Sequence, residues 1–474
     1  MLLDKQGALY QQVARALKLA IQEGRLAAGR KMPSTRSLAK ALRVSRKSIV
    51  QAYDLLCAEQ LAVARVGSGT RVAKMNDAAA KFNSPLIQQP TSQYVARMRE
   101  LGPLTLGTDA NYRYDLQYGV PLLTAPFLSS WGRRLAAAAI RVGPKYPTVG
   151  GFAPLRHALA DYLARRRAVI CDPANILIVG GMQQAVALVC RVLLDVRDSV
   201  VVEDPHYRLA VDALKAHGAR TLSVRTDSEG LVVRELPKSP VRLVFVTPAH
   251  QFPSGTIMSI SRRMELLRWA NANACWVFED DYDCEFHAGA RPIAALRSLD
   301  LADRVIHVGT FSKTLFPSLR LGYIVCPEAL KSDFFSAKLL DDLGSPTIEQ
   351  AALATFIQSG QYDSYLRNSR KEVLERRRAV IDALRRLVGD HIEIGPHEGG
   401  THFVLWLREL SFVQLRSLIE NAALAGLRLH PVHTYYRRKL PQPGLLVGYA
   451  GMPPYQLRAA VEVFARCLKA TKAA

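Results

Sequence analysis

Lys313 and Arg320 are the residues whose types and spacing point most directly to chemistry. Lys313 comes just after an apolar run, Val305–Val308, that is typical of a buried strand, and Arg320 follows seven residues later. A lysine amine at a strand end can form an imine with an aldehyde, and an arginine presents a planar fork that matches a phosphate. Thr310 offers a hydroxyl to the same phosphate. A lone lysine at a strand end is usually only a surface charge, so its companions decide the interpretation.

The segment around this lysine resembles a known cofactor site. The run from Gly309 to Lys313, with Pro317 and Arg320 behind it, resembles the S-K-x-x-x-P-x-x-R segment of fold-type I pyridoxal-phosphate enzymes. The resemblance implies that Lys313 forms the internal aldimine with pyridoxal 5′-phosphate. It also implies that Arg320 and Thr310 bind the phosphate of this cofactor.

An acidic run follows the apolar segment Trp276–Phe278. In fold-type I enzymes an aspartate after such a strand pairs with the pyridine nitrogen of the cofactor. The resemblance assigns this role to Asp280 and places Tyr282 at the phenolic oxygen of the ring. Asp281 is an alternative for the first role, because the sequence does not fix the register of the strand. A solvated turn also fits the composition, but it does not fit a position behind a buried strand.

A glycine pair that ends with Gly181 stands where a predicted strand passes into a helix. Glycines there let the backbone N–H groups of Met182 and Gln183 close on a phosphate at the helix N-terminus. Most glycine pairs are only turns. Together with the lysine and the arginine, this pair becomes the expected second contact with the cofactor phosphate.

Two further loops contribute candidates near the cofactor ring. Tyr207 matches the aromatic residue beside the ring in related proteins, although a core tyrosine fits its position nearly as well. The segment Thr247–Gly255 resembles the aminotransferase N-P-x-N-P-T-G loop, with His250 and Gln251 in place of the usual asparagine. We therefore predict that His250 lies near the ring, and we leave open which atom contacts the ring oxygen.

Basic residues are concentrated at the N-terminus. The 474-residue chain carries a formal net charge of +22, and residues 1–74 hold 14 Lys/Arg against 4 Asp/Glu. Such an excess indicates a polyanionic partner. Apolar periodicity predicts three short helices before residue 60, followed by a hairpin around Gly67–Gly69. Three helices and a hairpin in a basic segment are typical of a winged helix-turn-helix that binds DNA.

Residues 8–73 closely resemble the GntR-type winged helix. Arg46 and Lys47 begin the predicted third helix, where free N–H groups and the helix dipole favour a phosphate. From there they reach base edges or phosphates, although one basic pair by itself is usually solvated surface. Capping or wing packing would explain Arg36 and Thr70 equally well. The candidates for contact with double-stranded DNA are Arg36, Ser45, Arg46, Lys47, Ser48, Gly67, Gly69 and Thr70.

The rest of the chain predicts a linker and an α/β domain. We expect a winged helix at 1–74, a linker at 75–112 with a short helix near Gln93–Leu101, and an aminotransferase-like domain at 113–474 with a smaller C-terminal lobe. Short apolar runs that alternate with helices indicate a doubly wound sheet, with strands at 176–179, 200–202, 241–246, 276–278 and 305–308.

The cysteines and the apolar stretches exclude other classes of protein. The seven cysteines form no zinc-binding pair, and we expect reduced thiols and no metal site. No stretch is long enough to span a bilayer, so we expect a cytoplasmic protein.

The two modules together are similar to the MocR/GabR family of transcriptional regulators. The segments that carry this resemblance are T-P-x-H-Q-F-P-x-G, E-D-D-Y-D-x-E-F and G-T-F-S-K-x-L-x-P-x-L-R. The family implies a head-to-tail homodimer that binds pyridoxal 5′-phosphate. It also implies control of genes in amine, amino-acid or vitamin B6 metabolism, with an amine, an amino acid or the cofactor itself as effector.

One departure bears on the effector. Ordinary aminotransferases carry a C-terminal arginine for the substrate carboxylate, but Leu446–Tyr449 places a leucine there. Arg437 and Arg438 are the candidates to replace it, and they fit surface charges equally well. Our hypothesis is a regulator whose aminotransferase-like domain senses rather than catalyses. The alternatives are an active aminotransferase with a DNA-binding appendage and a cofactor-free regulator. Effector, operator and direction of control stay open.

Overall fold

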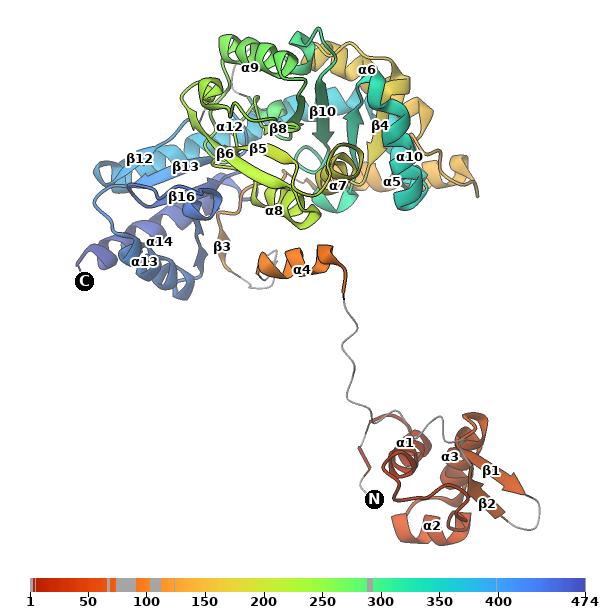
Figure 1. The fold of residues 1–474 in the computed structure, drawn as a ribbon. Coiled ribbons are helices and arrows are strands. Elements are labelled where there is room, and N and C mark those ends of the chain that lie inside the picture. The colour runs from red at the N-terminus through yellow and green to blue at the C-terminus, as the bar shows by residue number, and fades with distance from the viewer. Residues whose placement is uncertain are drawn as a thin grey trace. The chain divides into compact units, whose positions relative to one another are not determined.

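The computed structural model describes residues 3–4, 6–65, 69–73, 91–102, 112–122, 124–287, 293–397 and 399–473. The chain divides into two compact units, Met1–Pro90 and Thr91–Ala474 (Figure 1). Within the described residues, no helix is long and apolar enough to cross a membrane.

The first unit is a small helical domain with a two-stranded hairpin. Its apolar centre is formed by side chains from all three helices, among them Val13, Leu38 and Ile49. Side chains of Ser34 and Ser45 accept hydrogen bonds at the N-termini of the second and third helices, which fixes where each helix begins. The elements are α1 (Leu9–Gln22), α2 (Thr35–Leu42), α3 (Arg46–Ala58) and the antiparallel pair β1 (Ala62–Arg65) and β2 (Gly69–Val72).

The second unit is built around an eight-stranded sheet with the order β4-β11-β10-β9-β8-β5-β6-β7. The neighbours from β10 to β6 run parallel, whereas β11 runs antiparallel to both β10 and β4. The strands are β4 (Ile176–Val179), β5 (Ser199–Asp204), β6 (Arg220–Asp227), β7 (Gly230–Leu231), β8 (Leu243–Val246), β9 (Trp276–Asp281), β10 (Val305–Thr310) and β11 (Gly322–Val325).

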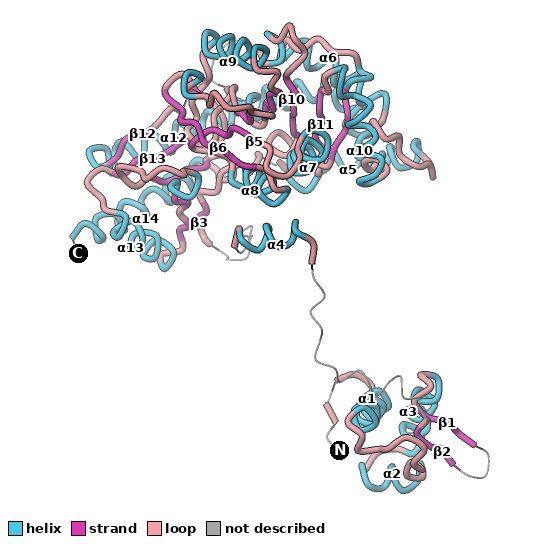
Figure 2. Tube along the Cα trace, in the orientation of Figure 1, coloured by secondary structure: helices cyan, strands magenta, loops and turns pink. Residues whose placement is uncertain are grey.

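Helices cover both faces of this sheet (Figures 1 and 2). One face packs against α7, α8 and α10, and the other packs against α5, α6, α9 and α11. The apolar runs predicted as buried strands are therefore covered on both sides, as a doubly wound sheet requires. The helices are α5 (Ala125–Val142), α6 (Ala153–Arg167), α7 (Met182–Leu193), α8 (Arg208–His217), α9 (Ile260–Ala272), α10 (Lys331–Asp342) and α11 (Thr347–Gln358).

The C-terminal lobe is a second layer of sheet and helices with its own apolar core. Its four-stranded antiparallel sheet has the order β12-β13-β16-β15. A short parallel pair joins β3 (Tyr114–Asp115) to β14 (Leu427–Arg428). The remaining elements are α12 (Gln361–Val388), β12 (Ile392–Ile394), β13 (His402–Leu407), α13 (Phe412–Leu424), β15 (His430–Pro431), β16 (Gly444–Gly448) and α14 (Pro454–Ala473).

A short helix, α4 (Gln93–Glu100), lies inside the stretch that the sequence assigned to a linker. It packs against α8 of the second unit. The guanidinium of Arg97 donates hydrogen bonds to the carbonyl oxygens of Ala216 and His217, each at 2.9 Å. These carbonyls belong to the last turn of α8, where helices leave acceptors without partners. Arg97 therefore attaches α4 to the C-terminal end of α8.

Candidate cofactor site and DNA-binding surface

The candidate cofactor residues lie at or just after the carboxyl ends of β4, β5, β8, β9 and β10. Lys313 follows β10, and its amine lies 3.4 Å from the carbonyl oxygen of Gly119. Gly119 has a φ of 69°, which favours glycine, and a β-carbon there would stand 2.3 Å from that amine and force the lysine side chain to shift. Burial lowers the pKa of Lys313, while the carboxylates of Asp283 and Asp280 oppose the shift. A lowered pKa leaves more of the amine unprotonated, and the unprotonated amine is the nucleophile.

Asp280 lies in β9, beside the strand that precedes Lys313. Its side chain is buried, and its Oδ1 atom has no hydrogen-bond partner. Burial and the neighbouring charge of Asp281 raise the pKa of Asp280 well above its ordinary value, against the opposing pull of Lys313. An orphaned buried oxygen of this kind calls for a donor. A ring nitrogen that carries a proton would supply one.

Asp281, the alternative residue for this role, is used elsewhere. Its Oδ2 atom accepts a hydrogen bond from Nε of Arg167 at 2.6 Å, and both side chains are almost fully buried. The imidazole of His307 lies 3.7 Å from the same oxygen. Because neighbouring residues of a strand point to opposite faces, the geometry favours Asp280 over Asp281 for a ring contact.

The residues predicted to bind the cofactor phosphate lie at the start of α7. Gly181 precedes this helix with a φ of 90°, a conformation that favours glycine. No side chain caps the helix, so the N–H groups of Met182 and Gln183 point out of its N-terminus. A β-carbon on Gly181 would lie 3.3 Å from the guanidinium of Arg320. Arginine and helix N-terminus therefore converge on one place, as a phosphate requires.

Thr310 is the last residue of β10 and stands three residues before Lys313 in the sequence. Its hydroxyl oxygen accepts a hydrogen bond from the N–H of Ser312 at 3.2 Å. The hydroxyl proton is still available to an acceptor, because a hydroxyl donates as well as accepts. Thr310 thus keeps the position that the sequence predicted for a phosphate contact.

Tyr282 and His250 are in direct contact. Nδ1 of His250 lies 3.0 Å from the hydroxyl of Tyr282; His250 is buried and Tyr282 is partly buried. Burial lowers the pKa of His250 to about 4, so its imidazole is neutral near pH 7. Gln251, the other residue in place of the asparagine, donates from Nε2 to the carbonyl oxygens of Pro205 and Phe252. The amide of Gln251 therefore holds the loop, and His250 supports Tyr282.

Tyr207 stands at the N-terminus of α8, half-buried. Its ring meets Phe252 edge to face, with the centroids 5.7 Å apart. Burial raises the pKa of Tyr207 to about 12, so the phenol stays protonated. Its position between α8 and the Phe252 loop is compatible with contact to a cofactor ring.

Arg437 and Arg438 are exposed, and other groups engage them. The guanidinium of Arg437 donates to the carbonyl oxygen of Thr221 at 3.1 Å and to the hydroxyl of Ser223 at 3.3 Å. The guanidinium of Arg438 lies over the ring of Tyr436. Both side chains thus have surface partners, which supports the surface-charge alternative for them.

Three buried residues of this region escaped the sequence reasoning as individual candidates: Glu203, Asp283 and His402. Glu203 accepts hydrogen bonds from the N–H and hydroxyl of Thr247. Asp283 accepts from the N–H of Thr401 at 2.8 Å. The only local signal was the acidic run after β9, in which Asp283 is the next residue after Tyr282. His402 follows a Gly-Gly-Thr turn far away along the chain and gave no local signal.

The candidate DNA-binding side chains gather at the starts of α2 and α3. Arg36, Arg46 and Lys47 are exposed, and within the described part of the chain none of them forms an ion pair. Nε of Arg46 lies 3.4 Å from the hydroxyl of Thr35. The hydroxyl of Ser45 accepts a hydrogen bond from the N–H of Ser48 at 3.1 Å and caps α3, and the two hydroxyls are 2.8 Å apart.

The wing is described only in part. Gly69 and Thr70 belong to β2, with Gly69 at a φ of 84°. Gly67 lies outside the described residues. The roles of these residues in a duplex contact stay a prediction.

Comparisons with known proteins identify both units. Residues 9–72 match the model of bacterial regulatory proteins of the gntR family, and residues 123–464 match aminotransferase class I and II. The probable rhizopine catabolism regulatory protein MocR of Rhizobium meliloti is 32% identical over 96% of this chain and 92% of its own length. The chain belongs to the MocR family of transcriptional regulators.

Another relative of this MocR-type regulator is the pyridoxine biosynthesis transcriptional regulator PdxR of Corynebacterium glutamicum. It is 30% identical over 94% of this chain and 93% of its own length. These relatives support the function predicted from the sequence, a DNA-binding transcriptional regulator.

Solved aminotransferases share the fold of the second unit. LysN, the alpha-aminoadipate aminotransferase of Thermus thermophilus in complex with N-(5'-phosphopyridoxyl)-L-leucine, matches with a TM-score of 0.70. The match has 26% identity and covers 81% of this chain and 98% of LysN. The multiple substrate aminotransferase of Thermococcus profundus matches with a TM-score of 0.69, 26% identity and coverage of 83% and 99%. The MocR-type regulator therefore has the aminotransferase fold of a pyridoxal-phosphate-dependent family.

Proposed function

We propose that this regulator holds pyridoxal 5′-phosphate at Lys313 and that the state of this pocket controls DNA binding by the first unit. The effector is an amine, an amino acid or the cofactor itself. The observation that carries the proposal is the unpartnered, buried oxygen of Asp280 beside a lysine amine of lowered pKa. When bound, the cofactor supplies an aldehyde and an electron-withdrawing ring.

Each residue has a definite task in this proposal. Asp280 accepts from the ring nitrogen, and Tyr282, supported by His250, donates to the ring oxygen. Tyr207 covers the ring. Lys313 supplies the amine that reacts with the aldehyde. The phosphate is held by the N–H groups that follow Gly181, those of Met182 and Gln183, together with Thr310 and Arg320.

The helix α8 offers a route from the pocket toward the DNA-binding unit. Tyr207 stands at its N-terminus, and its last carbonyls bind Arg97 of α4. Along the chain, α4 is the first described helix after Val72, and it lies at the beginning of the second unit. A change of the Tyr207 contact that shifts α8 would therefore move the point where the chain leaves this unit. A rigid helix can couple the pocket to DNA binding only if the helix has two alternative positions and the pocket favours one of them.

This route predicts the effect of Arg97→Ala. Typical allosteric coupling changes affinity by about 5–150-fold. Because α4 is released in this variant, we expect the effector to change DNA affinity by only about onefold, that is, not at all. The cofactor absorption band should stay as in the wild type. The matched control is Arg99→Ala, which removes an exposed arginine of the same helix. Full coupling in Arg97→Ala would contradict the route.

Domain limits, assembly and location belong to the same proposal. We place the winged helix at residues 1–74, the linker at 75–112 with α4 as its docked end, and the aminotransferase-like domain at 113–474. We propose a head-to-tail homodimer in the cytoplasm, which would present two winged helices to a duplex with two half-sites.

The test of this function joins the two units in one experiment. The full chain is titrated with pyridoxal 5′-phosphate and a panel of amines and amino acids while absorption and operator affinity are followed together. We expect a new near-visible band on cofactor addition, and a change in operator affinity when the band responds to one amine. No band, or a band with unchanged DNA affinity throughout the panel, would reject the proposal.

An active aminotransferase is the second candidate function. It is favoured by the presence of Lys313, Asp280 and Arg320 together on the fold of solved aminotransferases. Arg437 and Arg438 are the proposed contacts for an effector carboxylate, but their surface partners and the leucine at position 446 weaken this candidate. Multiple turnovers with an amino acid and an α-keto acid would favour the enzyme, and a single half-reaction would favour the sensor.

A further inference from the structure

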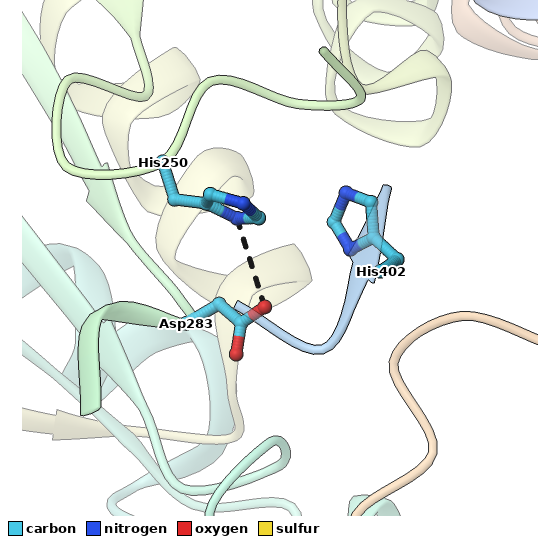
Figure 3. A group of neighbouring side chains, drawn as sticks. All are labelled: His250, Asp283 and His402. Atoms are coloured by element: carbon cyan, nitrogen blue, oxygen red, sulfur yellow. Dashed lines mark ion pairs between the residues drawn. The ribbon is translucent and has the colours of Figure 1, made fainter. Parts of the chain in front are cut away.

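Three buried side chains from three different elements meet in one group (Figure 3). His250 comes from the loop after β8, Asp283 follows β9, and His402 begins β13. One ligand atom of each residue lies within 4.8 Å of the other two. Nδ1 of His250 is 3.7 Å from Oδ2 of Asp283, and the two imidazole centroids are 5.0 Å apart at an interplanar angle of 60°.

The three side chains keep polar atoms without partners. Nε2 of His250, Oδ1 of Asp283 and Nε2 of His402 have no hydrogen-bond partner, although the exposed fractions of these residues are 3%, 1% and 1%. Native proteins seldom bury polar atoms unsatisfied, and such atoms often mark an ion or another ligand. All three residues belong to one compact buried group, and each keeps a polar atom without a partner, which points to a shared ligand.

The backbone around the group holds the carboxylate and closes the loop over it. The N–H and hydroxyl of Thr401 donate to Oδ2 of Asp283 at 2.8 and 3.1 Å. Gly400 has a φ of 70°, and a β-carbon there would stand 2.2 Å from Cε1 of His250 and 2.6 Å from Oδ2 of Asp283. Support of a ligand by a second layer of hydrogen bonds is typical of metal sites.

We propose that His250, Asp283 and His402 form a binding site for one divalent first-row transition metal ion, with Zn²⁺ as the reference ion. Two imidazole nitrogens favour zinc, cobalt or copper, whereas magnesium and calcium prefer oxygen ligands. Three protein ligands leave a coordination position open to water or to another small ligand. From the sequence we expected no metal site, since the three residues are far apart along the chain.

The charges of the three ligands partly compensate the charge of the ion. One carboxylate and two neutral imidazoles leave a site with a net charge of about +1 for a divalent ion. This is a small charge for a buried place that also contains the amine of Lys313. The site does not depend on the proposed sensing function, because its ligands are complete without a cofactor.

The test uses the untagged full chain, stripped with a chelator and free of added pyridoxal phosphate, which itself binds metals. Zn²⁺ is titrated by calorimetry, and Co²⁺ is followed by its visible absorption. The wild type is compared with His402→Phe and Asp283→Asn, which each remove one ligand and keep the side-chain size. His157→Gln is the control, because His157 is an exposed histidine outside the group.

We expect about one ion per chain in the wild type and in His157→Gln, and at least a tenfold weaker affinity in the two ligand variants. Substoichiometric binding by the wild type, or equal affinity in all four proteins, would overturn the proposal. If the ligand variants fail to fold, the electron paramagnetic resonance spectrum of Cu²⁺ bound to the wild type tests the proposal instead. Coupling to two imidazole nitrogens supports the site, and coupling to one or none overturns it.

Discussion

The two units of this regulator use charge in opposite ways. In the first unit Arg36, Arg46 and Lys47 are exposed and lie on helix starts, where we propose that they contact DNA. In the second unit Asp280 is buried and Lys313 is partly buried, and burial shifts the pKa of each toward its neutral form. Exposed charges make the association with a nucleic acid depend on the salt concentration. Buried charges instead tune the reactivity and selectivity of a single site.

The largest effect expected from this comparison is that of Lys313→Ala. It removes the only amine proposed to react with the cofactor, so we expect complete loss of the cofactor absorption band and of the effector response, with DNA binding retained. The control is Lys371→Ala, an exposed lysine on α12. Absorption titration and operator binding measure both properties, and a wild-type effector response in Lys313→Ala would contradict the role proposed for this lysine.

The next effect separates the two neighbouring aspartates of β9. Asp281→Asn leaves the buried guanidinium of Arg167 without its counter-charge, and we expect a loss of about 3–5 kcal/mol in the free energy of unfolding. Asp280→Asn breaks no internal hydrogen bond at Oδ1, so we expect a small change in the free energy of unfolding and weaker binding of the cofactor. Chemical denaturation and absorption titration test the pair. The reverse pattern would exchange the two roles.

Glu203 gives a prediction on pH. Burial raises the pKa of Glu203 from 4.5 to about 7. Between these values the folded chain keeps a proton that the unfolded chain has released, so this group lowers the free energy of unfolding as the pH rises through the window. The full effect is about 3 kcal/mol.

The test compares Glu203→Gln with the wild type by urea denaturation from pH 4.5 to 8. Glutamine cannot titrate, so we expect the variant to gain stability relative to the wild type as the pH rises and to level off above pH 7. A stability difference that stays constant over this range would show that the carboxyl is ionised throughout, held by the donors of Thr247.

The smallest effect belongs to the exposed charges. Arg46→Ala or Lys47→Ala removes one contact to a phosphate or a base edge, and we expect a loss of about 1–3 kcal/mol in DNA affinity. A phosphate contact also reduces the salt slope by about one. Lys18→Ala is the control, because Lys18 pairs with Glu59 within the same unit. Equal DNA affinity in all variants, measured over a range of salt concentrations, would show that the duplex contacts another surface of the protein.

Local sequence signals predicted the parts of the site that lie close together along the chain. The spacing of Lys313 and Arg320, the glycine before α7 and the basic start of α3 each fit within one turn or one loop. The fold class followed from the alternation of apolar runs and helices. These features depend on neighbours in sequence, so one chain is enough to recognise them.

Features that depend on distant contacts could not be predicted. The sequence left Asp280 and Asp281 as alternatives, because the face of a strand is set by what packs against it. His402 reaches His250 and Asp283 only through the docking of the C-terminal lobe. The antiparallel strand β11 and the attachment of α4 to α8 likewise arise from tertiary packing, which has no short-range pattern.

The most direct test of cofactor binding at Lys313 is chemical. The full chain is incubated with pyridoxal 5′-phosphate, reduced with borohydride, digested and analysed by peptide mass spectrometry. We expect one stable phosphopyridoxyl modification, at Lys313. An unmodified Lys313, or label spread over exposed lysines, would contradict the proposed site.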